Sequence, residues 1–290
     1  MPRAAPKKSL KTAAKKKRKS PARTIGTGNF KPTISAAEAI DRLVAEAPLP
    51  EWRPHQDPIA ELALTLLSQN TSDTNSGRAY QNLLRAFQTW DDIVAAPTDA
   101  VEDAIRIGGL AKTKAPRLQA LLAELRERLG PDWDPAILRT MPMPEAKQWL
   151  ISLPGVGPKT AACVMLFSLG RPALPVDTHV ERVSKRLGLV HTKVNAVKSH
   201  DVLEAQMDPE LYYDYHVAVI RHGRRVCKAP LPICDRCTLA DDCPSAFFRE
   251  RNRPDGATGK RIVGGKVSEK VGGKAGKAGK NTRPKTKPKR

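Results

Sequence analysis

The stretch L-P-G-V-G-P-K-T-A, Leu153 to Ala161, combines two glycines and two prolines with the start of an apolar run. Gly155 and Gly157 allow the backbone to turn tightly and to approach another surface closely. Pro158 suits the first turn of a helix that continues through Phe167. The stretch therefore predicts a hairpin that enters a helix, whose free N–H groups and positive dipole end favour an anion such as phosphate.

A lysine, Lys159, stands at the predicted start of this helix. The positive end of the helix dipole opposes its ammonium form, and partial burial would lower its pKa further. A neutral amine near pH 7 is a nucleophile that can form a Schiff base. A lysine here could equally be one more phosphate contact, so local sequence leaves both roles open.

An aspartate follows eighteen residues later, in L-P-V-D-T-H-V-E-R-V. Asp177 is expected to cap the amphipathic helix that begins there. A carboxylate held beside a lysine could also stabilise a developing cationic sugar or assist proton transfer. For His179, structural packing or a phosphate contact is favoured over catalysis.

Four of the five cysteines follow the pattern C-x6-C-x2-C-x5-C: Cys227, Cys234, Cys237 and Cys243. No secretory signal accompanies them, so disulfides are not expected, and four close thiolates call for zinc or an iron–sulfur cluster. The single C-x-x-C and its wider flanking gaps favour a [4Fe–4S] cluster over zinc. The fifth, Cys163, lies in an apolar run and is expected to be a small buried core residue.

Helical periodicity dominates the rest of the chain, and strand-like alternation is absent, so an all-α fold is expected. The predicted helices are 36–47, 57–68, 75–87, 99–106, 112–129, 158–169, 177–187, 194–206 and 211–222. Ser35 and Asp57 are candidate N-caps, with Pro58 in the first turn of the second helix.

The net charge of +20 is unevenly distributed. Residues 1–24 hold 10 Lys and Arg with no acid, and residues 251–290 hold 14 against 2 acids, whereas the body between them carries 26 basic and 28 acidic residues. Both ends are expected to be disordered tails that attract phosphate. Without a secretory signal or an apolar membrane-spanning run, the protein is expected in the cytoplasm near the nucleoid, or in the nucleus of a eukaryote.

The order of these motifs resembles the endonuclease III family of helix–hairpin–helix DNA glycosylases that carry an iron–sulfur cluster. The motifs are the hairpin, V-D-T-H, the tripeptide His222 to Arg224 and the four cysteines, within about residues 30–248. The resemblance implies excision of damaged bases, mostly oxidised pyrimidines, from double-stranded DNA, followed by strand cleavage at the abasic site. It implies Lys159 as the amine that attacks the sugar and Asp177 as the carboxylate that assists.

The resemblance also assigns DNA contacts. I-G-G-L-A-K-T-K-A, from Ile107, is similar to the family loop with a leucine wedge, which would be Leu110. L-L-S-Q-N-T-S-D, from Leu66, is similar to the segment whose glutamine fills the gap left by a flipped nucleotide, here Gln69 or Asn70. The remaining expected contacts are those of the hairpin (Gly155, Val156, Gly157 and Thr160), His179, Arg224 and Lys228.

The family fold implies two helical lobes with a DNA-binding cleft between them, in a monomer. One lobe would comprise residues 51–171, with the helix–hairpin–helix. The other would join 30–50 to 172–248, with the cluster loop, while 1–29 and 249–290 form the basic tails. The alternatives are a monofunctional mismatch-specific glycosylase, whose known relatives generally lack the lysine, and a non-catalytic DNA-binding module, which needs neither Lys159 nor Asp177.

Deleting residues 1–24 and 251–290 should weaken DNA binding and flatten its salt dependence, because fewer counterions are then released from phosphate. The rate of single-turnover excision should stay nearly unchanged. Affinity measured across a salt series checks this, and an identical salt slope in the truncated protein would contradict an electrostatic role for the tails.

Overall fold

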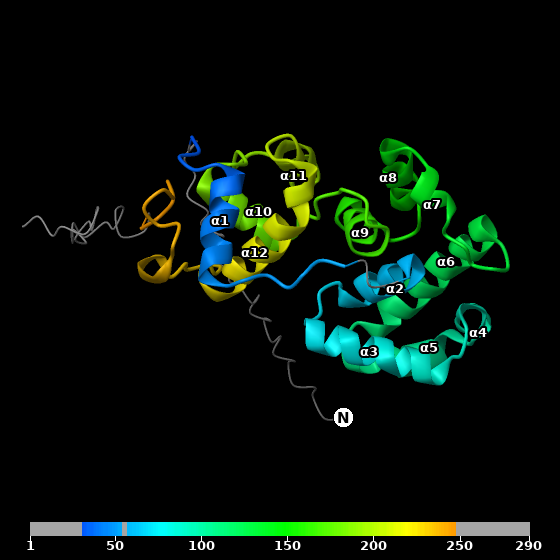
Figure 1. The fold of residues 1–290 in the computed structure, drawn as a ribbon. Helices are drawn as coiled ribbons and strands as arrows, with labels where there is room; N and C mark the ends of the chain where they lie inside the picture. Colours follow the sequence, from blue (N-terminus) through cyan, green and yellow to red (C-terminus); the bar gives the residue numbers. More distant parts are fainter. Residues whose placement is uncertain (1–30, 54–56, 248–290) are drawn as a thin grey trace, which may run out of the picture. The chain divides into compact units, whose positions relative to one another are not determined.

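The computed structural model describes residues 31–53 and 57–247, and within them every regular element is helical (Figure 1). The expected all-α fold is confirmed. The elements are α1 (Ala36–Glu46), α2 (Pro58–Ser68), α3 (Asp73–Ala86), α4 (Trp90–Ala95), α5 (Thr98–Ile105), η1 (Arg106–Gly108), α6 (Ala111–Leu129), α7 (Ile137–Thr140), α8 (Met143–Ile151), α9 (Pro158–Cys163), η2 (Val164–Ser168), α10 (Thr178–Leu187), α11 (Ala196–Glu204), η3 (Pro209–Leu211), α12 (Tyr212–Arg225) and η4 (Cys234–Arg236).

The predicted caps are present. The Ser35 side chain accepts a hydrogen bond from the backbone N–H of Glu38, whose carboxylate accepts one from the N–H of Ser35, which forms a capping box for α1. Asp57 caps α2 by accepting from Ala60 N–H at 3.0 Å, with Pro58 in the first turn. These local interactions set where the first two helices begin.

Three helices were not predicted: α4, α7 and α8. The first two have six and four residues, too few for a 3.6-residue periodicity to be visible. Prolines 142 and 144 flank the start of α8 and resemble a loop signal, although proline is well tolerated in a first helical turn. The helix α8 matters because it is the first helix of the helix–hairpin–helix.

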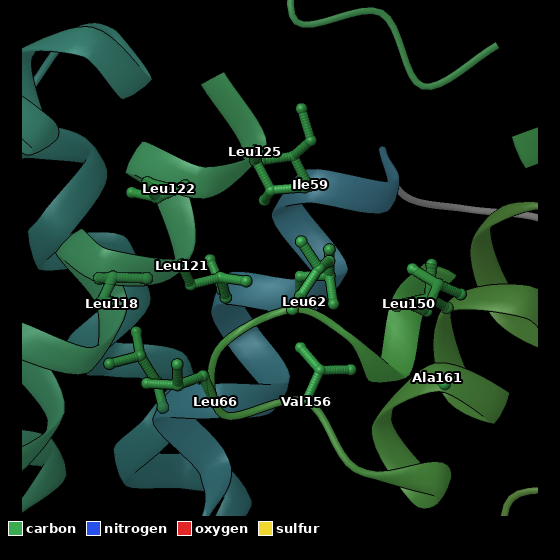
Figure 2. Close-up of a cluster of buried hydrophobic side chains, with 14 of the residues drawn as sticks. Ile59, Leu62, Leu66, Leu118, Leu121, Leu122, Leu125, Leu150, Val156 and Ala161 are labelled. Carbon is green, nitrogen blue, oxygen red and sulfur yellow. The ribbon is translucent and has the colours of Figure 1, made fainter. Parts of the chain in front are cut away.

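Buried apolar side chains form two clusters. The first core lies among α2 to η2 and includes Leu62, Leu118 and Leu121. In Figure 2, Leu62 of α2 lies opposite Leu121 of α6. The second core joins Ile40 of α1 to side chains of α10 and α12, such as Val183. The helix α1 therefore packs with elements more than 130 residues later in the chain. The helices of the first core lie between them in the sequence.

Polar and aromatic contacts join elements of the two cores. Lys147 of α8 forms an ion pair with Glu204 of α11 at 2.8 Å. The rings of Phe167 and Tyr213 meet edge to face, with centroids 6.1 Å apart. These contacts lie close to the stretch that links η2 to α10, and so they help to set the relative positions of the helices that carry Lys159 and Asp177.

The predicted tails, 1–29 and 249–290, lie outside the described residues. Across residues 31–53 and 57–247, no helix has the length and apolar character that crossing a bilayer would require.

Candidate active site and nucleic-acid interface

The hairpin between α8 and α9 is held by two buried side chains, Leu153 and Val156, which pack into the first core (Figure 2). Gly155 adopts φ +75°, a left-handed conformation that L-residues with a side chain rarely adopt. Gly157 is the N-cap of α9, and the space where its Cβ would stand is open. The hairpin thus presents bare backbone outward while its two apolar side chains hold it in place.

Lys159 lies in the first turn of α9 and is half-buried. One turn later, Cys163 is 4% exposed. Cys163 is therefore buried, as expected, but it also acts on the pKa of the lysine. Beyond it the helix continues as the π-helical turn η2, and π-type turns are often found at functional sites.

Asp177 caps α10, which confirms its predicted structural role. Its Oδ1 accepts from the backbone N–H groups of His179 and Val180, both at 2.8 Å. The extended segment before it is anchored by buried Leu174 and Val176. With Oδ1 fixed by the cap, the carboxylate has one oxygen left to act on neighbouring groups.

The expectation of a lowered pKa for Lys159 is wrong, because its neighbours outweigh the effect of burial. Burial acts to lower the pKa, but Cys163, Asp177 and Glu61 together raise it above the usual lysine value. Burial also raises the pKa of Cys163 to about 11, so at neutral pH its thiol is protonated and the two carboxylates supply the negative charge. Lys159 is thus an ammonium at neutral pH.

Glu61 of α2 is the residue of this site that sequence reasoning missed. It is 8% exposed and accepts a hydrogen bond from the Thr65 hydroxyl at 3.1 Å. A carboxylate in the middle of the apolar run 58–67 was the available signal, since glutamate is seldom buried without a partner. Its effect on the pKa of Lys159 depends on the packing of α9 against α2, which the sequence does not specify.

Two loops with unusual backbone carry the other expected contacts in this region. Asn70 and Leu110 both adopt φ +55°. Leu110 is 57% exposed, so its side chain is free of the buried core, as an inserting leucine would need to be. The Gln69 side chain donates to Gly155 O at 3.4 Å, which places it against the hairpin, whereas Asn70 is exposed.

The remaining expected DNA contacts are only partly available. Thr160 is 6% exposed and Val156 is 7% exposed, so each could offer only backbone to a ligand. His179 lies beside Arg182, whose Nη2 is 3.1 Å from its Nδ1, and burial lowers its pKa. Arg224 is exposed but forms an ion pair with Asp73 at 2.7 Å, while Lys228 is exposed.

The four clustered cysteines line one cavity, together with Arg186 and mostly apolar side chains. Arg186 was not singled out from the sequence. Its guanidinium donates to Cys227 Sγ at 3.1 Å and to Lys228 O at 2.9 Å, so it ties the cysteine segment to α10. Within the described residues, no three His, Cys, Asp or Glu side chains converge closely enough to hold a single metal ion.

Comparison with known families gives the decisive observation. The profile described as HhH-GPD superfamily base excision DNA repair protein matches residues 63–208, about half of the chain, from α2 to the segment after α11. The chain belongs to the HhH-GPD superfamily. The match includes the hairpin, Lys159 and Asp177.

Individual members of the superfamily agree. A candidate DNA glycosylase of Arabidopsis thaliana is 36% identical over 201 residues, 64% of each chain, so this chain spans just under two thirds of that relative. Endonuclease III of Thermotoga maritima is 32% identical over 197 residues, 68% of this chain and 86% of the relative.

Solved structures of endonuclease III are also similar. One bound non-covalently to DNA has a TM-score of 0.65 and 30% identity, covering 76% of this chain and all of that one. One trapped covalently on DNA has a TM-score of 0.64 and 30% identity, covering 74% of this chain and 99% of the other. The expected family, fold and class of activity, that of base excision repair glycosylases and abasic-site lyases, are confirmed at the level of the superfamily.

Replacing Asp177 by asparagine should lower the pKa of Lys159, because it removes a carboxylate that favours the ammonium while an asparagine still caps α10. The Nζ resonance of Lys159 followed through alkaline pH measures this. The folded protein holds this proton more tightly than the unfolded chain does. Its contribution to stability is therefore present at neutral pH and lost as pH rises through the folded-state pKa, and the variant should lose part of it.

The control is Asp41→Asn on the exposed face of α1, which should leave the Lys159 resonance unchanged. If Asp177→Asn titrates like the unmodified protein, the carboxylate does not act on the amine.

Proposed function

We propose that this protein excises damaged bases, with oxidised pyrimidines as the substrate class, from double-stranded DNA and then cleaves the strand at the abasic site through a Schiff base on Lys159. The observation that carries the proposal is the electrostatic coupling of Lys159 and Asp177, which start two different helices. An amine near a carboxylate, at the end of a backbone hairpin, suits attack on a sugar held at that hairpin.

Lys159 first has to lose its proton, because an ammonium has no lone pair. The carboxylates of Asp177 and Glu61 are the nearby groups that can receive it. The amine then forms a bond to C1′ as the bond to the base breaks, and the base leaves with that electron pair and takes up a proton. Ring opening of the sugar gives the imine.

The imine makes the C2′ proton acidic. A base removes that proton, the electrons form the C2′–C3′ double bond, and the 3′ phosphate departs with the electrons of its C–O bond. Asp177 stabilises positive charge during base loss, because its Oδ1 is held by the helix cap and its position is therefore fixed. Hydrolysis of the imine would release the product and restore the amine.

The DNA interface in this proposal is built from both cores. The hairpin would bind backbone phosphate through its N–H groups, and Leu110 with Gln69 or Asn70 would occupy the space vacated by the nucleotide. Arg224 and Lys228 would bind phosphate further along, with Arg224 exchanging its Asp73 partner for DNA. The protein would act as a monomer.

The cysteine residues fit an iron–sulfur cluster. Their four thiols line one cavity, and cysteine thiolates are the ligands that a [4Fe–4S] cluster would take there. Cys227, Cys234, Cys237 and Cys243 would hold the group, which would supply structural order to the segment after α12. The guanidinium of Arg186 beside Cys227 Sγ offsets negative charge on the thiolates.

Borohydride reduction should trap the wild-type protein covalently on a duplex with an abasic site or thymine glycol, and Lys159→Gln should reduce trapping to background, because an amide forms no imine. Lys198→Gln, an exposed lysine of α11, is the matched control and should trap normally. Trapping that persists in Lys159→Gln would place the nucleophile elsewhere. Base release without strand cleavage across a panel of lesions would favour the monofunctional alternative.

The purified protein should be brown and hold about four irons per chain. Cys234→Ser should lose most of this iron because one ligand is gone, whereas Cys163→Ser, at the fifth cysteine, should retain it. Iron and zinc analysis with a visible spectrum measures both. A colourless protein with one zinc per chain would overturn the cluster assignment.

A further inference from the structure

A buried lysine lies outside the proposed catalytic pair. Lys114, in the first turn of α6, is only 4% exposed, and no carboxylate among the described residues pairs with it. Burying an ammonium without a counter-ion is costly unless all of its donors are satisfied. The hydrogen-bond acceptors around Lys114 therefore indicate its structural role.

All three donors of Lys114 are used. Its Nζ donates to Leu67 O at 2.6 Å, to Thr71 Oγ1 at 2.5 Å and to Gly108 O at 3.3 Å. Thr71 Oγ1 in turn donates to Gly108 O at 2.6 Å. The ammonium thus joins two segments, residues 67–73 and 106–110, which we call the paired loops.

Each of the paired loops contains a residue in the left-handed backbone conformation. Asn70 immediately precedes Thr71, and Leu110 lies two residues after Gly108, both with φ +55°. A leucine in the left-handed region is uncommon, and such residues persist only where their surroundings hold them. The hydrogen bonds of Lys114 lie beside both of these residues, and of the two it is Leu110 whose conformation is unfavourable for its side chain.

Lys114 binds the second loop, residues 106–110, through its backbone as well as through its side chain. Its own backbone N–H donates to Leu110 O at 2.9 Å, while its side chain returns to Gly108 O. Gly108 is pressed against α3, because a Cβ added to it would lie 2.9 Å from Ala79 Cβ. The exposed side chain of Leu110 therefore projects from a backbone fixed on both sides.

We propose that Lys114 is a positioning residue that keeps the paired loops in register, so that Leu110 and the side chain of Gln69 or Asn70 enter the DNA together. The proposal rests on the proposed function, because it assigns the insertion of these side chains to DNA. Lys114 does not touch the reacting atoms. It acts through the backbone on either side of the inserted groups.

The test compares Lys114→Met, which keeps the length of the side chain but removes its donors, with Lys112→Met, an exposed lysine of the same turn. Both variants lose one positive charge, so their difference excludes a simple loss of phosphate attraction. Single-turnover excision from a paired lesion should fall about 10- to 100-fold more in Lys114→Met, because misplaced insertion leaves the nucleotide poorly extruded.

Strand cleavage at an abasic site that is already present should differ by less than about threefold between the two variants, because such a site leaves the stack more easily. A lysine that is only structural would lower both rates together. Equal losses on the two substrates would overturn the proposal.

A double-mutant cycle with Leu110→Ala tests the route of action. If Lys114 acts through Leu110, Lys114→Met should have little further effect on excision in the Leu110→Ala background. Fully additive effects would contradict the proposal. Should Lys114→Met fold poorly by thermal unfolding, Thr71→Val removes the hydroxyl between the loops and keeps the ammonium, and it should show the same contrast between substrates.

Hydrogen exchange on the DNA-free protein separates this inference from the proposed function. In Lys114→Met the amides of the paired loops should exchange faster, while those of α12 should be unchanged. If wild-type protein neither excises bases nor forms a covalent adduct, the proposed function fails, whereas the exchange result still reports on the contacts of Lys114. Unchanged exchange in the paired loops would overturn the role of Lys114 in holding them.

Discussion

The attraction between the Lys159 ammonium and the carboxylates around it is the interaction on which this site depends. Lys159 lies in the first turn of α9, Asp177 caps α10, and Glu61 belongs to α2. Bringing these groups together requires the two cores to be correctly placed, because Lys159 belongs to helices of the first and Asp177 to a helix of the second. The electrostatic interaction of Lys159 with Asp177 therefore depends on how the two cores pack together.

This attraction has a chemical consequence. A positive charge at a helix start is opposed by the helix dipole, and burial opposes it again, yet the neighbouring carboxylates keep the amine protonated. An ammonium has no lone pair, so in our proposal Lys159 must lose this proton before it can act as a nucleophile. In our proposal, the amine becomes reactive when its proton passes to the carboxylate of Asp177 or Glu61.

Buried basic side chains held by hydrogen-bond acceptors also occur outside the Lys159 site. Lys114 orders the paired loops, and Arg186 orders the cysteine segment by binding its carbonyls and Cys227 Sγ. In both places a long basic side chain satisfies backbone oxygens that irregular loops would otherwise leave without partners. These two residues show how a protein of short helices can hold functional loops rigidly.

Sequence by itself determined the helical class, the hairpin with Gly155, the cap at Asp177 and the grouping of four cysteines, because each follows from short-range rules of turn geometry, capping and spacing. It missed α8, whose prolines resemble a loop, and it assigned Lys159 the wrong direction of pKa shift. Only the tertiary structure decided that Glu61 and Cys163 raise the pKa of Lys159, that Leu110 is exposed and that Lys114 joins the paired loops. The physical reason is that burial and electrostatics depend on neighbours distant in the chain, which local patterns do not specify.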